Sequence, residues 1–242
     1  MAAQKRLKTK PRRPNQLRII GGQWRGRRLS FPDVEGLRPT PDRVRETLFN
    51  WLAPIITGAR CLDLYTGSGA LGLEALSRGA VEVVMVDRDL QVIARLREHI
   101  QTLHANGAQL VQADALGYLR QREIPPSPPL QAPHPPPPFE SPSLFPPFGK
   151  GGLGGIFQKG EPGGIFDIVF LDPPFGHNLL EPCCSLLEQH GWLAPNAYIY
   201  LESELESGLP TLPDNWRLKR SQKAGQVAYH LVVREQNTET QI

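Results

Sequence analysis

The chain has 242 residues, of which 40% are hydrophobic, so it is long enough to bury a full hydrophobic core. It contains no apolar run of about 18 residues, and no apolar stretch follows its basic first residues, which argues against a membrane span and a secretory signal. The three cysteines and six histidines show no metal-ligand spacing, so we expect no metal site and a reducing, cytoplasmic location.

Positive charge is concentrated at the start of the chain. Residues 1–28 hold ten Lys or Arg and no acid, whereas the remaining residues hold 17 basic and 24 acidic side chains. A basic arm over residues 1–30 on a mildly acidic body predicts a polyanionic partner, most simply nucleic acid. The alternative is a solubilising tail with no partner of its own.

Within the arm, apolar, aromatic and cationic residues alternate with flexible glycines. The arm residues that we expect to contact nucleic acid are Arg18, Trp24, Arg25, Arg27 and Arg28. Trp24 either stacks on a base or pins the arm to the body. A helix is then predicted to begin near Thr40, which can cap its free amides, with Pro41 in the first helical position. Its polar face adds Arg43 and Arg45 as nucleic-acid contacts.

From residue 60 onward, strand and helix patterns alternate. The expected strands are 61–65, 81–86, 110–112, 166–171 and 198–201, and the expected helices are 71–78, 90–103, 116–120 and 179–189. This alternation predicts an α/β fold with a mostly parallel sheet and helices on both of its faces. The segments 216–223 and 226–233 flank a short turn and predict an antiparallel hairpin at one edge.

The composition changes abruptly between residues 125 and 164. This stretch holds 13 of the 25 prolines and eight glycines. Such a sequence favours extended, solvated conformations and cannot bury enough apolar surface to offset its ordering entropy. We therefore expect a disordered surface insertion that divides one catalytic domain into residues 31–124 and 165–236. The alternative is a partner-binding segment that uses its phenylalanines.

A glycine-rich loop follows the first expected strand. Gly67, Gly69 and Gly72 have the spacing GxGxxG, and Asp87 follows Gly67 at the distance found in dinucleotide-binding folds. Asp63 discriminates between a dinucleotide and S-adenosylmethionine as the ligand, because its carboxylate would lie close to whatever the loop binds. It would repel a pyrophosphate but attract the ammonium and sulfonium groups of S-adenosylmethionine.

Acidic residues recur at the ends of the expected strands. Asp63 lies in the first expected strand, and Asp87, Asp114 and Asp172 follow the next three. Since the carboxyl ends of parallel strands meet at one edge of a sheet, we expect a shared acidic cleft. There Asp87 would hold the ribose hydroxyls, and Asp114 with Ala115 the adenine edge. The expected cofactor loop consists of Asp63, Gly67, Ser68 and Gly69. The alternative for the acids is an ordinary role as helix caps or turn residues.

The four residues Asp172, Pro173, Pro174 and Phe175 close an apolar strand and are the expected catalytic residues. The Asp172 carboxylate and the Pro173 carbonyl can together accept the two hydrogens of an exocyclic amine. Pro174 stiffens the turn, and Phe175 offers a flat face to a base. The tetrapeptide does not by itself say which amine it holds.

These motifs resemble those of the class I methyltransferases, and more narrowly those of the bacterial methyltransferases that modify guanine N2 in 16S ribosomal RNA. The similar stretches are residues 18–28, 37–52, 61–79, 166–175, 188–193 and 225–229. The resemblance implies a Rossmann-like, seven-stranded sheet with a reversed final hairpin and S-adenosylmethionine as cofactor. It also implies 16S rRNA in a partly assembled small subunit as substrate, so that the basic residues become RNA contacts, and it implies that Arg38 and Thr40 flank the methionine end of the cofactor.

Other interpretations remain open at this point. The same motifs suit a methyltransferase acting on adenine N6 in DNA. A non-catalytic RNA-binding assembly factor could also keep this fold. A dehydrogenase is disfavoured by Asp63 and by the lack of a His or Tyr next to the glycine loop for handling hydride.

Overall fold

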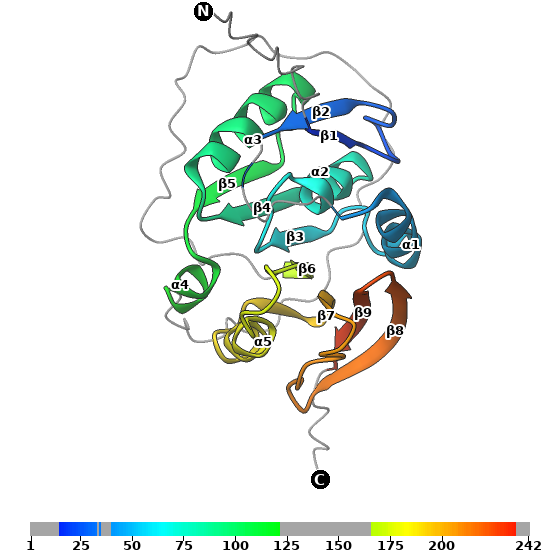
Figure 1. The fold of residues 1–242 in the computed structure, drawn as a ribbon, viewed down its shortest axis with the longest axis vertical. Helices are drawn as coiled ribbons and strands as arrows, with labels where there is room; N and C mark the ends of the chain where they lie inside the picture. The colour runs from blue at the N-terminus through cyan, green and yellow to red at the C-terminus, as the bar shows by residue number, and fades with distance from the viewer. Residues whose placement is uncertain (1–14, 33, 35–39, 122–165, 236–242) are drawn as a thin grey trace, which may run out of the picture.

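The computed structural model describes residues 15–32, 34, 40–121 and 166–235 (Figure 1). Arg38 and the predicted insertion, residues 125–164, lie outside the described residues.

A seven-stranded sheet lies at the centre of the molecule. Its strands are β3 (Arg60–Asp63), β4 (Glu82–Asp87), β5 (Ala108–Gln112), β6 (Phe166–Leu171), β7 (Leu193–Glu204), β8 (Trp216–Ala224) and β9 (Val227–Arg234). Their spatial order is β5-β4-β3-β6-β7-β9-β8. The first five in this order pair in parallel, whereas β9 runs antiparallel to both β7 and β8. The predicted mostly parallel sheet with a reversed final hairpin is therefore confirmed.

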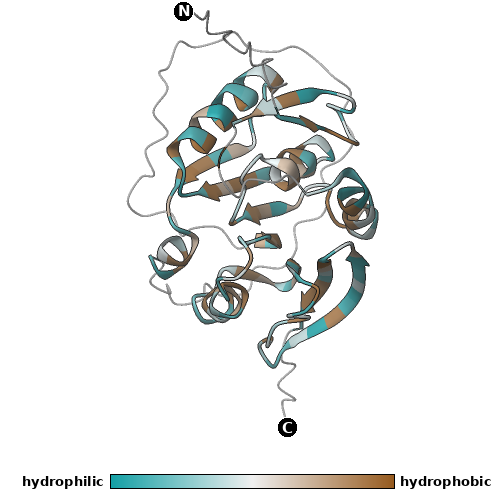
Figure 2. Cartoon of the chain, viewed as in Figure 1, coloured by the Kyte–Doolittle hydropathy of each residue, from teal (hydrophilic) through white to brown (hydrophobic). Residues whose placement is uncertain are grey.

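Helices cover both faces of this sheet. The helices are α1 (Asp42–Leu52), α2 (Ala70–Ser77), α3 (Leu90–Leu103), α4 (Ala115–Arg120) and α5 (Leu180–Gln189). Side chains alternate along each strand, so that Cys61 and Ile168 pack with α1, α2 and α3, while Leu62 and Val169 pack with α4 and α5. Figure 2 shows hydrophobic residues along β4 and a mixture of hydrophobic and hydrophilic residues along α3, as expected for a buried strand and an amphipathic helix.

The starts of two helices show how local sequence and tertiary contacts compete. In α3 the Asp89 side chain accepts hydrogen bonds from the amides of Gln91 and Val92, which is the usual cap. In α1 the prediction that Thr40 caps the helix is wrong, because Pro41 occupies the cap position and no side chain bonds the free amides. The Thr40 hydroxyl donates to Asp172 Oδ2 instead, at 3.1 Å. The helix begins one residue later than predicted, so Thr40 lies before the cap position.

The described part of the arm is a hairpin packed against the body. Strands β1 (Asn15–Arg18) and β2 (Arg28–Phe31) pair in antiparallel fashion beside α2 and α3 (Figure 1). The fully buried Glu74 carboxylate on α2 accepts the amides of Ile20 and Gly21, each at 2.8 Å. Gly22 has a φ of +73°, and a Cβ there would lie 1.7 Å from the Ser77 carbonyl oxygen, so only glycine permits this close approach.

Glu74 also forms ion pairs with Arg45 and Arg78, so we expect Glu74→Gln to loosen the hairpin. Breaking a buried ion pair costs about 3–5 kcal/mol, because one charge is left uncompensated. Urea unfolding monitored by circular dichroism would measure this loss. The matched control is Glu46→Gln on the exposed face of α1, which should change stability by less than about 0.5 kcal/mol. Equal losses in the two variants would contradict the assigned anchoring role.

Candidate active site

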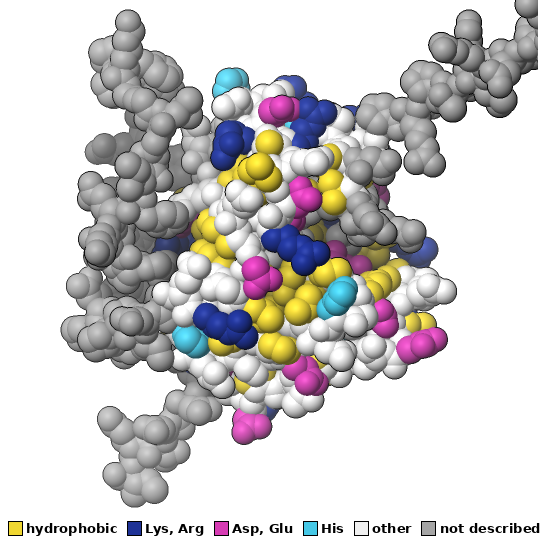
Figure 3. Space-filling view, turned by 60° about the vertical axis from the view of Figure 1, so that its left-hand side comes forward, with side chains coloured by type: hydrophobic (Ala, Val, Ile, Leu, Met, Phe, Trp, Pro, Cys, Tyr) yellow, Lys and Arg dark blue, Asp and Glu magenta, His cyan; other side chains and the backbone are white. Residues whose placement is uncertain are grey.

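The four acids predicted to share a cleft do lie at one edge of the sheet. Asp63 and Asp87 end β3 and β4, Asp172 directly follows β6, and Asp114 follows β5 by two residues. Strands β3 and β6 are neighbours at the point where the strand order changes direction, which is where open α/β sheets bind ligands. Figure 3 turns this edge toward the viewer and shows acidic and hydrophobic side chains next to one another on the surface.

Asp63 organises the glycine loop from beneath. Its buried Oδ2 accepts the Thr66 hydroxyl and the Gly72 amide, both at 3.0 Å. A Cβ on Gly72 would lie 2.7 Å from the Met85 sulfur, so this glycine allows α2 to pack closely on β4. Gly69 has a φ of +78°, and a Cβ there would lie 2.6 Å from the Leu96 side chain. The loop conformation therefore requires glycine at position 69, whereas Gly72 is favoured by the close packing of α2 on β4.

Asp87 and Asp114 also bond nearby backbone. Asp87 accepts the Gly67 and Asp89 amides, each at 2.9 Å, and Asp114 caps α4 through the Gly117 amide at 2.8 Å. Asp87 thus has the role of a turn residue and Asp114 that of a helix cap, which are the alternatives that the sequence left open. Each carboxylate keeps further acceptor sites, since a carboxylate has about four lone-pair positions. Ser68 and Ala115, which were expected beside them in the cofactor site, are buried.

Burial sets the electrostatics of this edge. Desolvation raises the pKa of Asp63 to about 7, and it also raises the pKa of Asp87. The pKa of Asp172 lies well above its usual value because of desolvation first and the nearby Glu202 carboxylate second. None of the ion pairs formed by described residues involves Asp63, Asp172 or Glu202. Clustered acids that lack a cationic partner are suited to a cationic ligand.

The turn after β6 presents both polar and flat surfaces. Asp172 is partly accessible and accepts the Thr40 hydroxyl, which leaves its other oxygen for a further donor. Pro173 is buried and Pro174 is exposed. Phe175 is 42% exposed, which is unusual for a large apolar side chain and leaves a ring face open beside the acid.

Two residues of β7 belong to this edge but were not predicted. Glu202 is 95% buried, and its Oε2 accepts the Tyr200 hydroxyl at 2.7 Å. The predicted strand ended at residue 201, so Glu202 is the acid that directly follows a strand. An acidic residue close to the carboxyl end of an expected strand is the pattern that identified the other acids, and this pattern applies to Glu202 as well.

The predicted RNA contacts divide into two groups. Arg25, Arg27, Arg28 and Arg43 are exposed. Arg18 is about half exposed although it pairs with Asp42 at 2.8 Å, and it lines a small surface hollow with Gln16 and Arg28.

Trp24 and Arg45 correct the prediction, because both side chains are buried. Trp24 packs into the core, so it pins the hairpin to the body and is not free to stack on a base. Arg45 is 1% exposed, pairs with Asp42 and Glu74, and donates to the Thr40 and Arg18 carbonyls. The pattern placed Arg45 on a polar helix face, but the hairpin covers that face.

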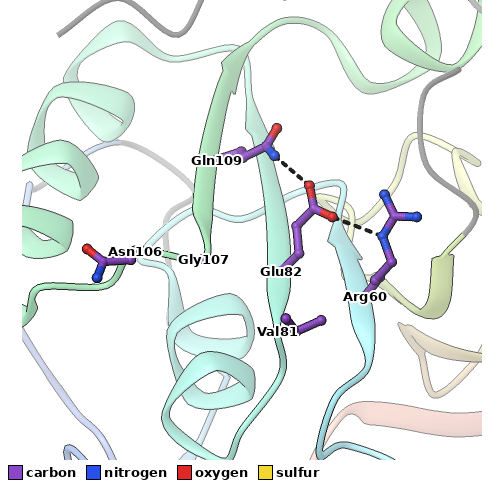
Figure 4. Close-up of a pocket in the computed structure, with 6 residues that line it drawn as sticks. All are labelled: Arg60, Val81, Glu82, Asn106, Gly107 and Gln109. Carbon is purple, nitrogen blue, oxygen red and sulfur yellow. Dashed lines mark hydrogen bonds and ion pairs between the residues drawn. The ribbon is translucent and has the colours of Figure 1, made fainter. Parts of the chain in front are cut away.

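A second hollow lies at the opposite edge of the sheet, where β3, β4 and β5 begin (Figure 4). Glu82 accepts hydrogen bonds there from Arg60 and Gln109, so these polar groups satisfy one another. The acidic edge is therefore the better candidate for the active site. In the part of the chain that the structure describes, no helix is long and apolar enough to cross a membrane.

The seven-stranded sheet with its reversed hairpin, the glycine loop and the acidic strand ends together define a class I methyltransferase. The family described as "Conserved hypothetical protein 95" matches residues 17–145 and 153–233. Ribosomal RNA small subunit methyltransferase D of Escherichia coli (strain K12) is 47% identical over 225 residues, which cover 93% of each chain. The protein of the same name from Haemophilus influenzae is 40% identical over 229 residues, covering 94% of this chain and 98% of that one. The chain therefore belongs to the family described as "Conserved hypothetical protein 95", together with these two relatives.

Solved structures confirm the fold. A putative methyltransferase, yhhF, from Escherichia coli has a TM-score of 0.71 and 45% identity, covering 91% of this chain and 99% of that one. The Thermus thermophilus 16S rRNA N2 G1207 methyltransferase in complex with AdoMet and guanosine has a TM-score of 0.54 and 19% identity, covering 93% of this chain and 50% of that one. The second likeness is one of fold alone.

Proposed function

We propose that this protein transfers a methyl group from S-adenosylmethionine to the exocyclic N2 amine of a guanine in 16S ribosomal RNA, on an assembling small subunit. Family membership supports the RNA substrate. The single observation that carries the chemistry is the position of Asp172. It lies beside the switch point of the sheet, next to the glycine loop strand, with the ring of Phe175 exposed three residues later.

The residues at this edge fit S-adenosylmethionine. Gly67 and Gly69 have positive φ values and no side chain, so the backbone is open to close approach by a ligand. Asp63 would attract the cationic methionine end, with Thr40 and Arg38 flanking it. Asp87 would accept the ribose hydroxyls, and Asp114 with Ala115 would border the adenine. The buried Asp63 carboxylate disfavours a dinucleotide pyrophosphate, and with it a dehydrogenase.

When bound, S-adenosylmethionine supplies a sulfonium methyl group, so the nitrogen lone pair forms an N–C bond as the C–S bond breaks and its electrons return to sulfur. The task of the protein is to position the amine. Asp172 and the Pro173 carbonyl would accept its two hydrogens and direct the lone pair, and correct alignment supplies about 7–11 kcal/mol in favourable cases. The negative charge of Asp172 stabilises the positive charge that grows on nitrogen. Phe175 would stack on the base, worth about 1–3 kcal/mol, which requires an unpaired or flipped nucleotide.

The exposed cations of the hairpin provide the grip on RNA. Reversing the charges of Arg25, Arg27 and Arg28 to glutamate should weaken RNA binding and reduce its dependence on log salt concentration by up to about 3 units, since each lost phosphate contact removes about one. Filter binding at several salt concentrations measures this slope. A matched control reverses three exposed arginines elsewhere, Arg97, Arg120 and Arg220. If the control lowers the slope equally, the hairpin is not the specific grip.

A methyl-transfer assay tests the proposed function itself. Radioactive S-adenosylmethionine would be offered with 16S rRNA, with DNA and with immature small-subunit particles, and the product nucleoside identified by mass spectrometry. The proposal expects N2-methylguanine in RNA. Methyl transfer to adenine N6 in DNA would support the alternative enzyme, and RNA binding without S-adenosylmethionine binding would support a non-catalytic assembly factor.

A further inference from the structure

The acidic edge holds a second buried carboxylate, Glu202, next to Asp172. Leu171 of β6 pairs with Leu201 of β7 in parallel register, so the next residues along, Asp172 and Glu202, lie side by side. Both project to the face occupied by Phe170 and Tyr200, because side chains alternate along a strand. Neighbouring strands lie about 4.8 Å apart, which places the partly accessible Asp172 carboxyl close to the buried Glu202 carboxyl.

Among the residues that the structure describes, the groups around this pair offer hydrogen-bond donors but no cation. Thr40 donates to Asp172, and Tyr200 donates to Glu202. Tyr229 on β9 lies opposite Glu202, but its hydroxyl donates to Gln222 at 2.8 Å. From β3, Asp63 adds a third acid that also acts on Asp172. Two buried acids that share one site cannot both ionise at low cost.

We propose that Glu202 is a positioning residue for methyl transfer, which makes Asp172 basic enough to take the proton that the guanine amine releases. This inference rests on the proposed function. As the N–C bond forms and the C–S bond breaks, the electron pair goes to sulfur and the nitrogen becomes a cation with one surplus proton. Asp172 accepts that proton, which neutralises the amine. The negative charge of Glu202 raises the proton affinity of Asp172. This favours proton transfer, since a general base works best with a pKa near the working pH.

At a pH below the acid limb of the pH–rate profile the pair holds one proton between its two carboxyl groups, and above the limb it loses this proton, so that Asp172 is free to accept the proton of the amine. The pKa of Glu202, like that of Asp172, is raised by burial. The Glu202 charge does not contribute to the raised pKa of Asp63, whose causes are burial and Asp87. Removing Glu202 should therefore change the titration of Asp172 and leave that of Asp63 in place.

The test replaces Glu202 with glutamine, which keeps the shape and an acceptor for Tyr200. Single-turnover methyl transfer at saturating S-adenosylmethionine would be measured against pH. We expect the plateau rate to fall by about tenfold, as part of the contribution of a general base. We also expect the acid limb to move to lower pH, because Asp172 loses a neighbouring negative charge. Glu204→Gln, on the same strand but past the acid pair, is the matched control and should match the wild type.

A second readout does not depend on activity. Infrared spectra of the free protein at a pH below the acid limb should show a protonated carboxyl band that weakens in Glu202→Gln and persists in Glu204→Gln. Tyr200→Phe removes the hydrogen-bond donor of Glu202 and should move the acid limb in the same direction. If Glu202→Gln does not fold, this variant tests the proposal in its place. The inference is overturned if folded variants keep the wild-type limb, rate and band. If the band behaves as expected but the wild type does not methylate guanine N2, the proposed function fails and the carboxyl pair stands.

Discussion

Replacing Asp172 with alanine is expected to lower the rate of methyl transfer by about 10²–10³-fold, the typical cost of removing one group that stabilises charge in a transition state. The affinity for S-adenosylmethionine should stay unchanged, because Asp172 is assigned to the amine and Asp63 to the cofactor. The chain lacks another accessible acid in this turn among its described residues, so no neighbour can replace it. Single-turnover kinetics on RNA and calorimetry with the cofactor measure the two quantities separately.

Asp167→Ala is the matched control for this variant. Asp167 lies on the same strand, but it is exposed near the amino end and accepts the Arg60 amide there. Its loss should leave the transfer rate close to that of the wild type. Wild-type turnover in Asp172→Ala would remove Asp172 from the reaction, and a parallel loss of cofactor affinity would place it in the cofactor site instead.

Replacing Asp63 with alanine should weaken S-adenosylmethionine binding before it affects anything else. The carboxylate is proposed to attract the cationic end of the cofactor, and an interaction with a charged group contributes about 1.5–3 kcal/mol. Loss of one such interaction corresponds to about a tenfold to hundredfold rise in the dissociation constant. Circular dichroism would establish that the variant remains folded.

The pH dependence of cofactor binding gives a sharper form of the same prediction. Since burial raises the pKa of Asp63 to about 7, its carboxyl is neutral below that pH and charged above it. A cationic ligand should therefore bind the wild type more weakly as the pH falls through about 7. The variant Asp63→Asn carries no charge at any pH and should lose this dependence, whereas Asp167→Asn should keep it. Calorimetric affinities of Asp63→Asn that follow the wild-type pH curve would contradict the assignment.

Local patterns predicted the regular elements well where a single periodicity was uninterrupted. Helix α3 and strand β6 have the predicted bounds, because an amphipathic repeat with an Asp89 cap and an unbroken apolar run are each complete in the local sequence. Strand β7 was predicted from residue 198, but it begins at Leu193. Pro195 and Asn196 have the character of a turn, and the β6 pairing passes from Leu193 to Tyr198 with an irregularity between them, which local periodicity does not reveal.

The candidate site divides in the same way. The sequence by itself determined the glycine loop and the order of acids, because both follow from which residue types come directly after a strand, and parallel strands bring those positions to one edge. Only the tertiary structure decided that Trp24 and Arg45 are buried, that Thr40 bonds Asp172 and does not cap a helix, and that Glu202 lies beside Asp172. Each of these depends on contacts between segments far apart in the chain, and no local periodicity encodes which of two possible partners a side chain meets.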